Sequence, residues 1–127
     1  MQIKLTSVMV NDQNQALKFY TAILGFVKKK DIPMGEARWL TVVSPEKPDD
    51  IELLLEPMGF PPAKTYQEAL FKAGIPSTSF FVKDIQSEYD RMKKLGVVFR
   101  TEPTPAGPVI IATFEDTCGN LIQICQV

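Results

Sequence analysis

The sequence predicts an α+β fold in which two β-α-β-β-β modules form a cupped mixed β-sheet with helices on its outer face. The first observation is an internal repeat, because Val10-Asn11-Asp12 before the first predicted helix matches Val82-Lys83-Asp84 before the third. The second is that Leu24-Gly25-Phe26 follows the first of these helices, as Leu95-Gly96-Val97 follows the other. One such module cannot cover both faces of its own sheet, so we expect the two to shield a shared core.

The first module is predicted at about residues 1–57. Residues 2–10 alternate as a strand, and Asn11-Asp12 then caps a helix that ends at Gly25. The apolar stripe of this helix consists of Ala16, Phe19, Tyr20 and Ile23. Three further strands are predicted at 26–32, 37–44 and 51–56.

A connector with its own helix is predicted at about 58–74, and the second module at about 75–127. Phe60-Pro61-Pro62 interrupts the pattern before a helix at 64–73, whose expected apolar face is Tyr66, Ala69, Leu70 and Ala73. The second module then has a helix that begins after Asp84 and ends at Gly96. Its strands are predicted at 76–83, 97–103, 108–115 and 120–126.

The composition favours one soluble domain over residues 1–127. The chain has 45% hydrophobic residues, and its 14 basic and 15 acidic side chains leave a net charge of −1, so we expect neither nucleic acid nor a membrane as a partner. No signal peptide or membrane span is recognisable, and a cytoplasmic location is expected. Lys28-Lys29-Lys30 is interpreted as a solvated strand end or edge protection instead of a phosphate site.

The chain contains no histidine, which excludes many catalytic arrangements within one chain. Ser-His-Asp triads, Cys-His dyads, His-containing zinc sites and facial triads are all unavailable. Cys118 and Cys125 are expected to be free thiols, because two cysteines so close in sequence make no obvious disulfide framework.

Glu52 and Gln123 occupy equivalent places in the two modules. Glu52 follows the capping Asp12 by 40 residues and Gln123 follows Asp84 by 39, and each lies between apolar neighbours. Strand alternation should bury those neighbours under the helices and turn the two polar residues to the concave side. Gln123 could be a ligand-facing group, a vacated metal position or a polar residue in water. Glu52 could contact a ligand or be a hydrated structural carboxylate. Arg38 is the best candidate for its donor, and the alternative for Arg38 is an exposed salt bridge.

Four segments together carry a family resemblance. These are "VNDQNQALKFYTAILGF", "IELLLEP", "FFVKDIQSEYDRMKKLGV" and "FEDTCGNLIQI", and they resemble the glyoxalase, bleomycin-resistance and ring-cleaving dioxygenase superfamily, also called vicinal oxygen chelate proteins. The resemblance covers nearly the whole chain and implies a cup in which the enzymes hold a divalent metal with His and Glu. The implied ligand positions are Leu5, Glu52, Thr78 and Gln123, with Ser7 and Ser77 as possible neighbours.

Of the implied positions, only Glu52 is a good ligand for a divalent metal. We therefore expect a member without metal or cofactor that binds or sequesters a small organic ligand. The expected ligand-binding residues are Glu52, Gln123, Thr78, Leu5, Arg38 and Ser7. The alternatives are a lyase, isomerase or dioxygenase with an atypical metal site, and an interaction protein whose own side chains fill the cup. The resemblance also implies a homodimer.

Overall fold

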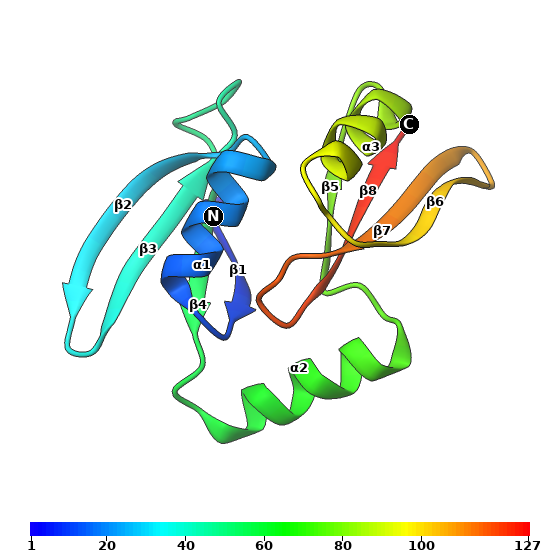
Figure 1. The fold of residues 1–127 in the computed structure, drawn as a ribbon. Coiled ribbons are helices and arrows are strands. Elements are labelled where there is room, and N and C mark those ends of the chain that lie inside the picture. Colours follow the sequence, from blue (N-terminus) through cyan, green and yellow to red (C-terminus); the bar gives the residue numbers. More distant parts are fainter. The chain divides into compact units, whose positions relative to one another are not determined.

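The computed structural model describes residues 1–127, and its strands form two four-stranded sheets (Figure 1). The chain divides into two units, Met1–Thr65 and Tyr66–Val127. Each unit contains the predicted β-α-β-β-β order, so the α+β class and the internal repeat are confirmed. None of the helices has the length and apolar character needed to cross a membrane.

The sheet of the first unit has the strand order β1-β4-β3-β2. Its strands are β1 (Leu5–Val10), β2 (Val27–Met34), β3 (Ala37–Val43) and β4 (Glu52–Pro57). The first strand runs parallel to β4, whereas the other neighbouring pairs are antiparallel. The edge strand β2 contains Pro33, which an edge tolerates because one side of its backbone needs no partner.

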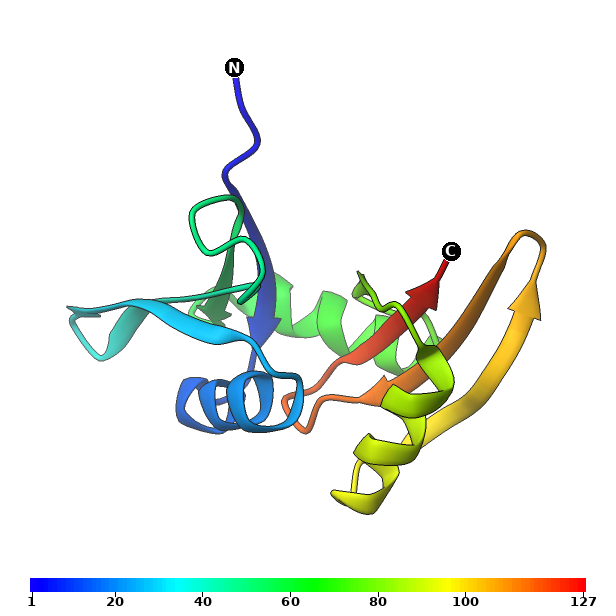
Figure 2. The ribbon, with the colours of Figure 1, turned by 90° about the horizontal axis from the view of Figure 1, so that it is seen from above.

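The predicted first helix consists of two segments, α1 (Gln13–Lys18) and the π-helix η1 (Phe19–Ile23), which form one continuous coil beside the sheet (Figure 2). The Asp12 carboxylate accepts a hydrogen bond from the Gln15 backbone N–H at 3.0 Å, which confirms the predicted cap. The buried helix residues Ala16, Phe19 and Tyr20 belong to the predicted stripe. Because α1 contacts β3 and β4, one face of this sheet is the core-forming face.

The sheet of the second unit repeats this topology with the order β5-β8-β7-β6 and with β5 parallel to β8. Its elements are β5 (Thr78–Phe81), α3 (Ile85–Lys94), β6 (Phe99–Ala106), β7 (Val109–Glu115) and β8 (Leu121–Gln126). The Asp84 carboxylate accepts from the Ser87 backbone N–H at 3.1 Å. Helix α3 contacts β6, β7 and β8, and its Tyr89 ring packs on Phe99 at 4.6 Å between centroids.

Helix α2 (Pro61–Ala73) begins three residues before the predicted start, since proline is well suited to the first turn of a helix. The predicted apolar face is wrong at Tyr66, Ala69 and Ala73, which are all exposed, whereas Gln67 is buried. The Gln67 amide donates to the Cys118 carbonyl at 3.2 Å and to Asn120 Oδ1 at 3.1 Å. These bonds explain how a polar residue is buried, and they join α2 to the turn before β8.

The turn before β8 is organised by the buried Asp116 carboxylate. Its Oδ1 accepts from the backbone N–H groups of Cys118 and Asn120 at 2.8 and 3.0 Å, and its Oδ2 accepts from the Asn120 side-chain amide at 2.8 Å. Cys118, within this turn, and Cys125, on β8, are buried free thiols. The segment therefore supplies a rigid start for the strand that carries Gln123.

Candidate functional site

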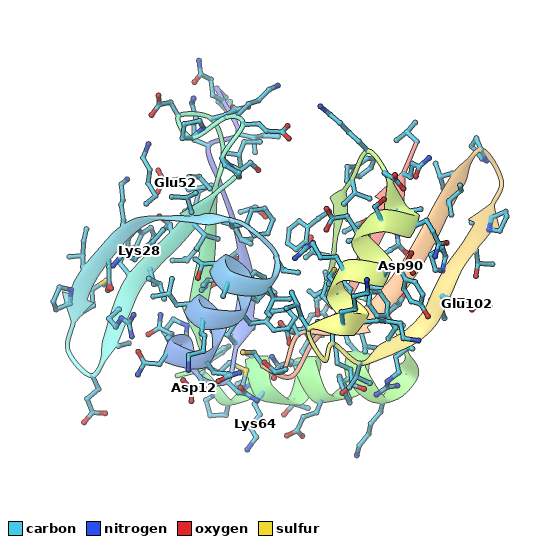
Figure 3. All side chains as sticks on the ribbon, turned by 45° about the horizontal axis from the view of Figure 1, so that its top comes forward. Asp12, Lys28, Glu52, Lys64, Asp90 and Glu102 are labelled. Atoms are coloured by element: carbon cyan, nitrogen blue, oxygen red, sulfur yellow. The ribbon has the colours of Figure 1, made fainter.

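In each sheet, alternate residues point to the helix or to the opposite side, which we call the helix-free face. Glu52, the first residue of β4, is labelled in Figure 3. It lies on the helix-free face of the first unit, because it alternates with the buried Leu53, which lies opposite the buried Val42. Leu5 on β1 lies directly opposite Glu52, and Ser7 lies opposite Leu54 on the same face. The register of β1 therefore matches the predicted alignment of Leu5 with Glu52, and both Leu5 and Ser7 are exposed.

The Glu52 carboxylate has two donors, one on the adjacent strand β3 and one on the edge strand β2. The Thr41 hydroxyl donates to Oε1 at 2.8 Å, and the Lys30 ammonium lies 3.3 Å from Oε2. The same Thr41 oxygen accepts from the Lys30 backbone N–H at 3.2 Å. One buried hydroxyl therefore hydrogen-bonds to both the Glu52 side chain and the Lys30 backbone. The Thr41 hydrogen bond lowers the pKa of Glu52, burial opposes this change, and Lys30 adds to the lowering. Glu52 is therefore ionised at neutral pH.

Arg38 is not a donor to Glu52 and instead forms a salt bridge, which was the alternative interpretation of this residue. It lies on the helix side of β3, the same side as Leu40, as strand alternation predicts. Its guanidinium donates to Asp31 at 3.0 Å and to the Asn14 side chain, which lowers the pKa of Asp31. The Gln13 amide also donates to the Arg38 carbonyl at 2.7 Å. Arg38 thus joins α1 to β2 and β3 and is separated from Glu52 by the sheet.

In the second unit, Gln123 lies opposite Ser79 on β5 and opposite Thr113 on β7. The Gln123 amide donates to the Ser79 hydroxyl at 3.2 Å. Thr78 instead lies opposite Ile122, on the side that faces α3, so the expected register of this strand is off by one residue. The neighbour of Gln123 is therefore Ser79, which is the repeat equivalent of Leu5.

Ser77 has a structural role at the entry to β5. Its hydroxyl donates to Asn120 Oδ1 at 3.1 Å, and Asn120 also accepts from Gln67. This network lies at the turn before β8 and stabilises the start of that strand. The Ser77 hydroxyl is thus bonded within the turn before β8 and does not belong to the surface around Gln123.

The residues at the implied metal positions do not fit a transition metal. Leu5 has no donor atom, Ser79 and Gln123 offer neutral oxygens, and the Glu52 carboxylate already binds Thr41 and Lys30. Within either unit, no three His, Cys, Asp or Glu side chains are grouped so that they could hold a metal ion. A metal would have to displace the Lys30 ammonium and would gain a single charged ligand.

The repeated module, with one polar position at the start of β4 and its equivalent on β8, defines a protein of the paired β-α-β-β-β class. Residues 2–124 match the family model of the Glyoxalase/Bleomycin resistance protein/Dioxygenase superfamily, and the chain belongs to that superfamily. The resemblance inferred from the sequence segments is thereby confirmed.

Three similar proteins illustrate this relationship. The protein YurT of Bacillus subtilis (strain 168) is 59% identical over 126 residues, which cover 99% of each chain. The crystal structure of UcmS2 has a TM-score of 0.84 at 28% identity and covers 98% of this chain and 97% of its own. TnmS3, an antibiotic binding protein from Streptomyces sp. CB03234, has a TM-score of 0.77 at 28% identity and covers 99% of this chain and 95% of its own.

Sequence reasoning missed Lys30, Thr41 and Ser79. Alternation along β3 already separated Thr41 from Arg38, so the pairing of β3 with β4 would have identified Thr41 as a neighbour of Glu52. To place Ser79 beside Gln123, the register of β5 with β8 has to be known. To place Lys30 beside Glu52, the β-bulge in β2 has to be known. Neither of these two signals is present in a simple alternating pattern.

Proposed function

We propose that the protein binds a small organic molecule without a metal, and that it holds the molecule instead of transforming it. The observation that carries this proposal is the state of Glu52, whose carboxylate is bound by Thr41 and Lys30 and whose repeat equivalent is the neutral Gln123. A charged ligand set, which the metal enzymes of the superfamily require, is absent from these positions.

The helix-free faces are the surfaces we propose for ligand contact. In the first unit this face combines the polar group at Glu52 with the partly exposed Trp39 and with Leu5 and Ser7. A mixture of apolar surface with a few oriented polar groups is typical of small-molecule sites. The similarity to TnmS3, an antibiotic binding protein, supports binding as the activity. A cytoplasmic location remains part of the proposal.

We also propose that the chain forms a homodimer. Each sheet has two edge strands, β1 and β2 in the first unit and β5 and β6 in the second. Exposed edges need protection, and a two-fold interface is the commonest closed solution. Light scattering at micromolar concentration should give twice the chain mass of 14.2 kDa. A mass that stays at that of one chain as the concentration rises would contradict the dimer.

Elemental analysis and thermal unfolding test the binding proposal. Protein purified without chelator should contain far less than one equivalent of Zn, Ni, Mn or Fe. N-phenylnaphthylamine, a neutral aromatic probe, should raise the unfolding temperature, and at 100 times its Kd the stabilisation should be about 2.7 kcal/mol. Near-stoichiometric metal would overturn the metal-free proposal and favour a lyase, isomerase or dioxygenase with an atypical site.

A further inference from the structure

Strand β2 contains a β-bulge that separates its three consecutive lysines. The register shifts between Lys28 and Lys30, so Lys28 lies opposite Val42 whereas Lys30 lies opposite Thr41. In a regular strand, Lys28 and Lys30 would share one face, but the extra residue places them on opposite faces. Lys28 thus lies on the helix side near Asp31, at 3.8 Å, and Lys30 lies on the helix-free face with Glu52.

Lys29 is the extra residue of the bulge, and its side chain is itself anchored. The Lys29 ammonium donates to the Pro48 carbonyl and to the Asp49 carboxylate, both at 2.9 Å. Lys28 and Lys29 therefore have partners of their own, Asp31 and Asp49. The direction of the Lys30 side chain follows from the bulged backbone. Such irregularities commonly redirect a side chain toward a functional surface.

Lys30 presents the outward charge of this surface. Its side chain is 47% exposed, whereas that of Glu52 is only 19% exposed. Glu52 lies behind the ammonium, with its other oxygen bound to Thr41. A lysine ammonium has three N–H donors, so its contact with one carboxylate leaves donors for a further acceptor.

The surface next to Lys30 is apolar. Ile32 lies two residues after Lys30 on the same strand. It is 51% exposed and lies opposite Trp39 on β3. An exposed aliphatic side chain and a partly exposed indole beside an oriented ammonium suit a molecule with a ring system and one anionic oxygen group. The apolar body would bury area on Ile32 and Trp39, and the oxygen would accept a charge-assisted hydrogen bond from Lys30.

We infer that Lys30 is a ligand-binding residue and that this face takes aromatic organic anions, whose carboxylate, phenolate or sulfonate oxygen contacts the ammonium. The inference rests on the proposed function and specifies the ligand class of the same surface. Glu52 orients Lys30 and moderates its charge. Removal of Lys30 should therefore weaken anion binding, and neutralisation of Glu52 should strengthen it.

Two probes that share a ring system test this inference. Anilinonaphthalene sulfonate carries an anionic oxygen group, and N-phenylnaphthylamine is its neutral counterpart. Fluorescence titration should show that Lys30→Met weakens binding of the sulfonate about ten-fold, the equivalent of about 1.4 kcal/mol, with binding of the amine unchanged. Lys28→Met is the matched control, because it removes the same charge from the opposite face and should change neither affinity by more than about two-fold.

Further variants separate Lys30 from its neighbour. Glu52→Gln should tighten sulfonate binding. The double variant Lys30→Met with Glu52→Gln should bind the sulfonate more weakly than Glu52→Gln alone. Because the double variant has no unpaired carboxylate at position 52, this loss would come from the missing ammonium. Lys30→Arg should retain most of the affinity. Circular dichroism and urea unfolding verify that each variant is folded.

The outcomes distinguish the two proposals. Equal effects of Lys30→Met and Lys28→Met, or an unchanged sulfonate affinity in Lys30→Met, would overturn the ligand class but leave the binding function intact. Failure of the wild-type protein to bind either probe would contradict the proposed binding function and this inference together. Selective loss of the sulfonate in Lys30→Met alone is the expected result.

Discussion

Thr41→Val removes the hydroxyl that connects Glu52 to Lys30 and keeps the size of the side chain. Thr41 is fully buried, donates to Glu52 Oε1 at 2.8 Å and accepts from the Lys30 backbone N–H at 3.2 Å. Valine can make neither bond. The substitution therefore tests whether this hydroxyl organises the candidate site.

The expected loss of stability follows from these two bonds. A hydrogen bond to a charged group contributes about 1.5–3 kcal/mol, and an ordinary bond contributes about 1 kcal/mol. The methyl group that replaces the hydroxyl recovers part of this by apolar burial. We expect the free energy of unfolding to fall by about 2–3 kcal/mol at pH 7.

The effect of Thr41→Val should depend on pH. The pKa of Glu52 is lower in the folded state than its usual value of 4.5, mainly because of Thr41. The stabilisation from ionised Glu52 is therefore fully present above pH 4.5 and is lost as the pH falls through the folded-state pKa. The difference between wild type and Thr41→Val should shrink over this acidic range.

Urea unfolding at pH 7 and at pH 3 measures this difference, with Thr41→Ser as the control. Serine keeps the hydroxyl and loses one buried methyl group, which costs about 1 kcal/mol at either pH. A Thr41→Val protein as stable as wild type at pH 7 would refute the assigned role of Thr41. A loss that is identical at both pH values would refute the link to Glu52 ionisation.

Three more substitutions probe the rest of the structure. Gly119 has φ +95°, and a Cβ there would lie 2.6 Å from Gln67 Oε1, so Gly119→Ala should cost about 3 kcal/mol by urea unfolding. Gly107→Ala has φ +63° with nothing within 4 Å and should cost about 1 kcal/mol; equal losses would contradict the role of the Gln67 contact. Arg38→Met should leave the Kd of N-phenylnaphthylamine within about two-fold of wild type, because Arg38 lies on the helix side; a large change in a folded variant would return Arg38 to the site.

The modular fold was predictable because its signals are local. The capping Asp12 and Asp84 and the glycines that follow their helices recur at matching places, so the repeat is visible without tertiary information. The equivalence of the Glu52 and Gln123 positions in the two modules follows from the same spacing. The start of α2 was missed because Phe60-Pro61-Pro62 reads as a break, although proline also begins helices.

The candidate site was only partly predictable because it depends on strand register. Ser77, Thr78 and Ser79 are consecutive small polar residues, so no alternation identifies which of them faces Gln123. The bulge in β2 likewise reverses the face of Lys30 without a local sequence signal. Gln67 is buried by acceptors more than fifty positions away in the sequence, which helix periodicity cannot reveal.

The central claim is metal-independent binding of a small organic molecule. Its most direct test is a fluorescence titration of the protein with N-phenylnaphthylamine before and after exhaustive treatment with a chelator. We predict one saturable isotherm whose Kd is the same in both samples, because the residues at the implied metal positions offer only one charged ligand and do not fit a transition metal. Loss of binding after chelation, with recovery on addition of Zn, Ni, Mn or Fe, would contradict the account.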